Sequence, residues 1–320
     1  MAQYERYKWF TEPRLDPATG NEIPGMRWRA WEQLRQLEQA QGPRNSSWFN
    51  DGPANVSGRC LALAVDPTDP NTVYAGFASS GIWKTTDAGT TWVPLDDYLP
   101  TLAVSAIKID PSNHTHIWMG TGEGWNNVDA VHGVGLLESH DAGATWNTTG
   151  FSYAISQGRD VYVVEYNPTT GTLMLGADNG LWRSLDGGAT FTQLFNGSWT
   201  DLQIKKGSTS TWFGSAHGTT AGFYISNDDG ATWTLVTNGT PTTGIANNRF
   251  ALTANDTNYI YWAIDRGDQS DMSIYKSTNG GASFSDVFDG AHYGAQGSYN
   301  LTISVDPNNK NTVYSGGVSF

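Results

Sequence analysis

Apolar residues near the start of the chain recur at helical spacing. Trp28, Trp31, Leu34 and Leu37 are three residues apart, with charged and polar residues between them. This pattern predicts a short amphipathic helix, which Gly42-Pro43 ends. Residues 1–47 are therefore expected to form an N-terminal arm that packs on the outside of the main domain or on a partner.

From residue 60 onwards the pattern changes to one typical of strands. Leu61, Leu63 and Val65 alternate with alanines, as in a half-buried strand. Cys60 begins this segment, and we expect its thiol to be buried. Because it is the single cysteine in the chain, an intrachain disulfide is excluded.

An octapeptide of the form Ser/Thr-x-Asp-x-Gly-x-Thr/Ser-Trp/Phe recurs five times. The third residues of successive copies lie 54, 45, 42 and 51 residues apart along the chain. This spacing matches one four-stranded propeller blade per repeat. We expect a hairpin turn in which the side chain of the third residue accepts hydrogen bonds from backbone N–H groups. The closing aromatic residue is expected to be buried between blades. The third residues are Asp87, Asp141, Asp186, Asp228 and Asn279, and the closing aromatic residues are Trp92, Trp146, Phe191, Trp233 and Phe284.

A second repeated block supports the propeller. Val65-Asp66-Pro67 and the following Asn71 to Gly76 return, with the same internal spacing, at Val305 to Gly316. The sequence thus predicts an all-β propeller over residues 48–320, with five full blades and part of a sixth. We expect further sequence or a partner chain to complete a ring of six to eight blades, with seven favoured, because exposed strand edges are generally avoided.

The octapeptides resemble the Asp-box, or bacterial neuraminidase repeat, superfamily. The resemblance extends over about residues 48–320 and is closest to sortilin-like domains, xyloglucan-cleaving endoglucanases and unassigned secreted bacterial proteins. It implies that the acids of the octapeptides are structural and that the protein works outside the cell. The sequence shows no leader peptide, and it carries eight Asn-x-Ser/Thr sequons.

The net charge and composition of the chain exclude several kinds of partner. The net charge of −13 argues against nucleic acid, and no segment is apolar enough to span a membrane. We expect no cofactor and no metal site, because no His/Cys spacing resembles one. The expected partners are a glycan or an extracellular protein, or a chain that completes the ring.

Three arginines are expected at equivalent blade positions, where the innermost strand of each blade opens. They are Arg59, Arg159 and Arg249. Two interpretations stay open: a positive ring that binds carboxylates, or side chains that pair with a neighbouring blade and hold the ring together.

A long insertion in the second blade is another candidate site. It carries Glu123, Trp125, Asp129 and His132. Trp125 could stack on a sugar ring, and the two acids could act as a carboxylate pair; alternatively, the glycines only let the loop fold over the channel. In blade five, Asp265-Arg266-Gly267-Asp268, with Asp271 nearby, is either a cation site or, as we favour, a solvated turn.

Known chemistries of the superfamily fit poorly. A sialidase would need an Arg-Ile-Pro segment, but Cys60-Leu61 follows Arg59. Xyloglucan-cleaving enzymes carry a catalytic Asp in a Thr-Asp-x-Gly-Gly segment, where this chain has residues 77–81, Phe-Ala-Ser-Ser-Gly.

Two functions remain. The favoured expectation is an extracellular propeller that binds a glycan or protein, or serves in an assembly, without catalysis. The alternative is a polysaccharide-active glycoside hydrolase or lyase that uses the channel arginines and the blade-two insertion, with Glu123, Asp129 and His132 as catalytic candidates.

Overall fold

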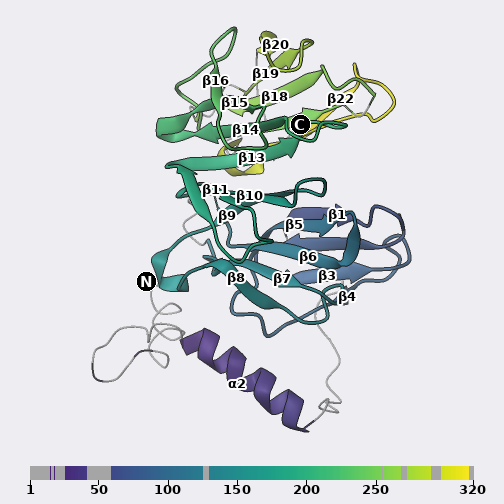
Figure 1. The fold of residues 1–320 in the computed structure, drawn as a ribbon, viewed down its shortest axis with the longest axis vertical. Helices are drawn as coiled ribbons and strands as arrows, with labels where there is room; N and C mark the ends of the chain where they lie inside the picture. Colours follow the sequence, from purple (N-terminus) through teal and green to yellow (C-terminus); the bar gives the residue numbers. More distant parts are fainter. Residues whose placement is uncertain are drawn as a thin grey trace, which may run out of the picture.

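The computed structural model describes residues 15, 18, 26–41, 59–124, 130–253, 255–267, 272–289 and 297–316. Over this part of the chain, antiparallel sheets follow one another in sequence order (Figure 1). Five sheets have four strands and a sixth has two. The all-β propeller predicted from the repeats is therefore confirmed, with five four-stranded blades.

Each blade is a meander in which every strand pairs with the next one along the chain. Blade 1 comprises β1 (Cys60–Val65), β2 (Val73–Phe77), β3 (Ile82–Thr85) and β4 (Val93–Pro94); blade 2 comprises β5 (Val104–Asp110), β6 (Asn113–Thr121), β7 (Gly135–Ser139) and β8 (Asn147–Ser152); blade 3 comprises β9 (Val161–Asn167), β10 (Thr172–Ala177), β11 (Gly180–Ser184) and β12 (Thr192–Phe195). Blade 4 comprises β13 (Ser198–Ile204), β14 (Trp212–His217), β15 (Gly222–Ser226) and β16 (Thr234–Val236); blade 5 comprises β17 (Asn247–Leu252), β18 (Ile260–Asp265), β19 (Met272–Ser277) and β20 (Ser285–Asp289); the last sheet pairs β21 (Thr302–Val305) with β22 (Val313–Gly316).

Apolar side chains form a separate core between each pair of successive sheets. Between blades 1 and 2, for example, Ile82 of β3 packs with Ile117 of β6 and with Trp146, and all three are almost fully buried. Four similar clusters follow, up to the one between blade 5 and the last sheet. The innermost strands β1, β5, β9, β13, β17 and β21 contact one another in that order.

The helix expected near the N-terminus is α2 (Met26–Gln41), which lies beside blades 1 and 2 (Figure 1). Trp31 is buried, and Arg35 stacks on it and donates a hydrogen bond of 2.8 Å to the carbonyl of Trp146. Leu37 is exposed. The remaining described helices are single turns: Ile155–Gln157, Gly218–Thr220 and α3 (Gly297–Asn300).

The octapeptide turns share one hydrogen-bond pattern. In the fourth copy, Asp228 Oδ1 accepts from Thr232 N and Ser226 Oγ, both at 2.8 Å, and Oδ2 accepts from Thr232 Oγ1 at 2.6 Å. The same bonds recur at Asp87, Asp141 and Asp186. Asn279 keeps the geometry, since its amide donates to Ser283 Oγ at 2.8 Å where the other copies use a second carboxylate oxygen.

The octapeptide turns of blades 2 to 5 pack against the preceding blade. A Cβ at Gly143, in the second copy, would lie 2.6 Å from Leu95 of blade 1, so only glycine fits. This packing buries Trp146 and Phe284, but Trp92 is 38% exposed. The prediction that Trp92 is buried between blades is wrong, because no sheet precedes blade 1 in the described part of the chain.

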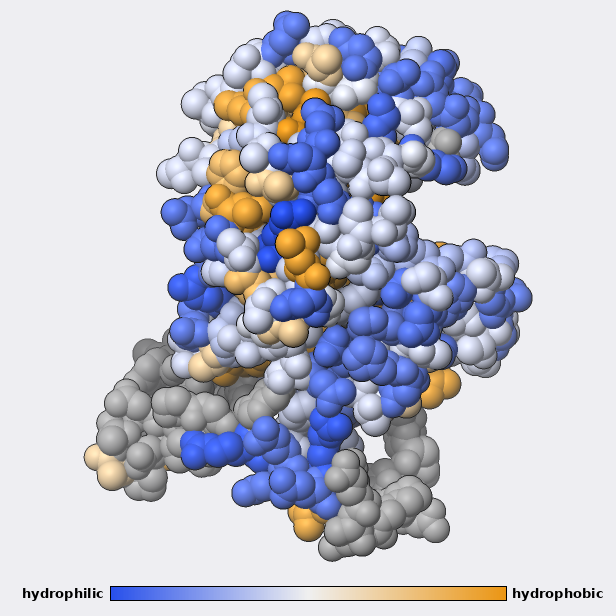
Figure 2. Space-filling view, viewed as in Figure 1, coloured by the Kyte–Doolittle hydropathy of each residue, from blue (hydrophilic) through white to orange (hydrophobic). Residues whose placement is uncertain are grey.

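The first sheet of the series also has a solvent-facing side. Leu63 and Val65 of β1 are exposed, as is Tyr314 of β22 in the last sheet. The molecule is hollowed between these two ends of the series (Figure 2). The expectation of a buried Cys60 is wrong for the same reason: its thiol is exposed, because β1 packs a described sheet only on the side facing blade 2.

The octapeptide turns give a direct test of the hydrogen-bond pattern. Bonds from the threonine hydroxyl and amide, followed by the first Ser or Thr hydroxyl, lower the pKa values of Asp87, Asp186 and Asp228 to about 2. These carboxylates therefore stabilise the fold above their ordinary pKa, and that stability is lost as the pH falls towards 2. In Asp228→Asn the Asn279 geometry is available, so we expect almost wild-type stability at pH 7, whereas Asp228→Ala loses about 1 kcal/mol. Urea unfolding measures the free energy of unfolding of both variants. An equal loss of stability in the two would contradict the hydrogen-bond pattern assigned to the turn.

Candidate functional site

One end of the blades holds most of the candidate site residues. The innermost strand of each blade begins where the second strand ends, as the pairs Val104–Thr121, Val161–Ala177 and Asn247–Asp265 show. The octapeptide turns lie at the opposite end, after the third strand. We call the first end the site face; it holds Arg59, Glu123, Asp160, Asp178 and His217.

The predicted arginines lie at equivalent places on the site face, and the described structure puts a carboxylate near each. Arg59 forms an ion pair with the buried Glu123 of blade 2. Arg249 donates to the carbonyls of Thr200 at 2.9 Å and Asn248 at 3.1 Å, and it faces Asp201 of blade 4. This geometry links neighbouring blades, as the second interpretation of the arginines requires.

Arg159 lies beside two carboxylates that were not recognised in the sequence. Asp160 follows it directly, and Asp178 donates its backbone N–H to the carbonyl of Asp160 at 3.1 Å. The charge of Arg159 lowers the pKa of Asp178, but burial outweighs it and the pKa of Asp178 is raised. Each of the three arginines thus lies near at least one acid of the protein itself.

The two carboxylates differ in their partners. Asp160 is buried, and it accepts from His132 Nδ1 at 3.3 Å and from Gly133 N at 3.2 Å. Asp178 has one buried carboxyl oxygen with no hydrogen-bond partner among the described residues. Burial raises the pKa of both groups, and for Asp178 the negative charge of Asp160 adds to the effect.

Tyr153 completes this group, which we call the acid cluster: His132, Tyr153, Arg159, Asp160 and Asp178. The Tyr153 hydroxyl is buried without a partner in the described structure. Burial, followed by the charges of Asp160 and Asp178, raises its pKa. Of the five, sequence reasoning selected His132 and Arg159. Asp178 could have been found in the turn Asp178-Asn179-Gly180, which replaces the longer connections of other blades.

A second group continues along the site face from Glu123. A Cβ at Gly124 would overlap the ring of Tyr162, so this glycine permits close contact between blades 2 and 3. Tyr162 lies edge-on to His217 of blade 4, with ring centroids 6.2 Å apart. Burial, and then the charge of Arg249, lowers the pKa of His217, which favours its neutral form.

Some predicted residues fall outside the described part of the chain. Trp125 and Asp129 of the insertion do so, as do Asp268 and Asp271 of the blade-five cluster. Asp265 is buried, and Arg266 donates to the hydroxyl of Tyr275 at 2.8 Å.

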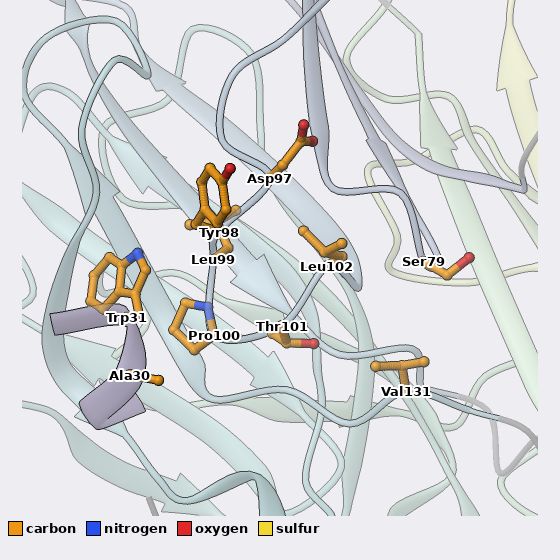
Figure 3. A pocket seen from close by; sticks show the side chains of 10 residues that line it. All are labelled: Ala30, Trp31, Ser79, Asp97, Tyr98, Leu99, Pro100, Thr101, Leu102 and Val131. Atoms are coloured by element: carbon orange, nitrogen blue, oxygen red, sulfur yellow. The ribbon is translucent and has the colours of Figure 1, made fainter. Parts of the chain in front are cut away.

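A pocket of about 470 Å³ lies beside the site face, between α2 and the connection from blade 1 to blade 2 (Figure 3). Trp31, Tyr98 and Pro100 form one side of it, and Thr101, Leu102 and Val131 lie farther along. Thr101 donates to the carbonyl of His132 at 3.0 Å, which connects the pocket wall to the acid cluster. Tyr98 is 62% exposed, so its ring is accessible to a ligand.

Comparison with known proteins gives partial matches. No protein-family model matches the chain. A xyloglucanase of Hypocrea jecorina (strain QM6a) is 24% identical over 75% of this chain and 27% of the relative, and a xyloglucanase of a Paenibacillus species is 26% identical over 72% and 26%. This chain therefore matches only about a quarter of the length of these relatives.

Among solved structures, a GH74 enzyme of Niastella koreensis superposes with a TM-score of 0.58 at 20% identity. The match covers 80% of this chain and 44% of that one. It supports the propeller fold.

These matches correct the favoured functional expectation. A module that only binds or assembles, without catalysis, is contradicted, because the curated relatives are named as enzymes that cleave a polysaccharide. The hydrolase alternative is supported instead. Among the described residues, no helix is long and apolar enough to cross a membrane.

Breaking the ion pair between Arg59 and Glu123 is expected to lower the stability of the fold by a measurable amount. Arg59→Leu leaves a buried carboxylate without its partner, and we expect a loss of about 2 kcal/mol, since the arginine is partly exposed. Adding Glu123→Leu should restore most of the loss. Chemical unfolding of the single and double variants measures the difference; a fully stable Arg59→Leu protein would show that the pair does not link the blades.

The carboxyl of Asp178 is expected to destabilise the fold when it is ionised. A raised pKa means that the ionised carboxyl destabilises the fold, so stability decreases as the pH rises from the ordinary pKa through the raised one. We expect Asp178→Asn to be more stable than wild type at pH 7, by about 0.5–2 kcal/mol, and no more stable at pH 3.5. Thermal melts at the two pH values measure this, and a variant destabilised at pH 7 would contradict the burial of an unpaired carboxyl oxygen.

Proposed function

We propose that this chain is part of a polysaccharide-active glycoside hydrolase whose acid cluster performs the chemistry. The observation that carries the proposal is the pair Asp160 and Asp178, two adjacent carboxyls with raised pKa values and different partners. Glycoside hydrolysis uses two carboxyl groups, one as the acid and one as the base or nucleophile. Adjacent titratable groups held in different environments are typical of that division.

The partners assign the roles. Asp178, whose pKa is raised by burial, is the acid of the pair and donates a proton to the leaving oxygen as the glycosidic bond breaks. Asp160 accepts hydrogen bonds from Gly133 N and His132, which favour its ionised form. It therefore acts as the base that takes a proton from a water molecule, and the oxygen of that water bonds to the anomeric carbon as the glycosidic bond breaks. Because the two interact, they titrate as a pair with two apparent pKa values.

The neighbouring pocket supplies sugar contacts. Tyr98 offers an exposed aromatic face, which is a common platform for the apolar side of a sugar ring, and Thr101 is fixed next to His132. A polysaccharide that lies over Tyr98 would reach the acid cluster along the wall formed by Thr101 and Val131. The pocket therefore supports binding of an extended chain.

The relatives suggest the substrate class. Because these relatives are named xyloglucanases, the substrate we favour for this chain is a β-glucan of the xyloglucan type. The stretch at 77–81 has Ala78 where such enzymes carry their acid, so we assign the acids to blades 2 and 3 instead. The lyase alternative is less favoured, since each channel arginine already faces a carboxylate of the protein.

We further infer that the octapeptide turns are Asp-boxes and that the protein is extracellular. The repeated carboxylate geometry at Asp87, Asp141, Asp186 and Asp228 supports the first inference, and the naming of the relatives supports the second. Under this proposal residues 1–47 form an arm beside a propeller that begins near residue 48.

Release of reducing ends tests the activity. Purified protein is incubated with xyloglucan, mixed-linkage β-glucan and carboxymethylcellulose across pH 4–8. We expect turnover of at least one β-glucan, and a kcat reduced by about 100-fold or more in Asp178→Asn. Tyr98→Ala should raise KM several-fold and leave kcat almost unchanged.

Asp286→Asn is the matched control, because Asp286 lies on the exposed strand β20, away from the site face. It should retain wild-type rates. No reducing ends from any of the three substrates, or full activity in folded Asp178→Asn, would overturn the proposal.

A further inference from the structure

A second group of chemically active side chains lies on blade 2, near the octapeptide end. Trp118 of β6 pairs directly with Glu138 of β7, and Ile117 pairs with Ser139. One position further, the same register places His116 opposite His140. Since side chains alternate along a strand, His116, Glu138 and His140 project from one face of the sheet.

The donor atoms of these three side chains converge. His116 Nε2 lies 3.3 Å from Glu138 Oε2, and His140 Nε2 lies 3.7 Å from the same oxygen. All three ligand atoms are within 4.8 Å of one another. Ligand atoms at about 2.0–2.1 Å from a tetrahedral zinc ion are themselves about 3.3 Å apart, which is close to the distances of the two histidine nitrogens from Glu138 Oε2.

We propose that His116, Glu138 and His140 bind one divalent transition metal ion, with Zn²⁺ the expected occupant. Two imidazoles and one carboxylate are a familiar ligand set for zinc, and they leave a coordination position open for water. The ligand set excludes a preference for Mg²⁺ or Ca²⁺, which select oxygen ligands.

The surroundings hold the ligands in place. The ring of His116 packs on Trp118, with centroids 4.0 Å apart, and Trp118 is buried against Tyr166 of blade 3. Lys108, which lies opposite Trp118 on β5, is paired with Glu165 and so does not neutralise Glu138. The His140 side chain is 59% exposed, which gives an ion access from solvent.

No metal site is expected from the sequence, because no His/Cys spacing resembles one; His116 lies 22 residues before Glu138 and 24 before His140. The strand register, and not the spacing, brings them together. The site also lies at the octapeptide end of blade 2, so it is separate from the acid cluster, and its role is to fix β6 to the start of the octapeptide turn.

Titration calorimetry with Zn²⁺ on chelator-treated protein tests the proposal. We expect one ion per chain, and affinity weakened by more than about tenfold in His116→Ala and in His140→Thr. His140→Thr is safe for folding, because Thr86 and Thr278 occupy the same position in two other octapeptides. Zn²⁺ should also raise the Tm of wild type and leave that of His140→Thr unchanged.

The matched control is His114→Ala. His114 lies two residues before His116 on β6, but its ring contacts Thr68 and Asp66 at 3.0 Å, so this variant should bind Zn²⁺ as wild type does. Absence of binding to wild type at 0.1 mM Zn²⁺ would overturn the proposal, as would equal affinity in His140→Thr. Polysaccharide cleavage by His140→Thr should be normal. A failure to bind Zn²⁺ would therefore leave the hydrolase proposal intact, and a failure to cleave polysaccharide would leave the metal site intact.

Discussion

The octapeptide turn is the constraint on which the rest of this structure depends. Its carboxylate ties the first and seventh residues together, and its glycine allows the turn to approach the blade before it. Each turn therefore fixes two things at once: the hairpin between the third and fourth strands, and the position of one blade against its neighbour. A series of such contacts lets short strands with modest cores form a regular array.

The same residue type serves opposite purposes at the two ends of the blades. At the octapeptide end, hydroxyl and amide donors lower the pKa values of Asp87, Asp186 and Asp228 to about 2, so these acids stay charged and structural. At the site face, burial raises the pKa values of Asp160 and Asp178. Burial of the carboxyl at the site face, and hydroxyl and amide donors at the octapeptide turn, therefore shift the pKa values of the acids in opposite directions at the two ends.

The fold was predictable because the signal is local and repeated. Octapeptide spacing predicted the blades, and residues at one repeat position, such as Arg59 and Arg249, were correctly placed at the start of the innermost strands. Burial at the first blade was not predictable in this way. Trp92 and Cys60 fit the pattern of buried residues, but burial requires a neighbouring sheet, and blade 1 has a described one on a single side.

The site was less accessible to sequence reasoning because it depends on pairs across strands. Asp160 and Asp178 are separated by a hairpin, and His116 and His140 by the blade-two insertion, so neither pair has a recognisable spacing. Repeat comparison even directs attention away from them, since it emphasises positions that all blades share. Both proposed sites lie where blades 2 and 3 differ from the others: at the tight turn that carries Asp178, and at His116 and His140, which face one another across β6 and the end of β7.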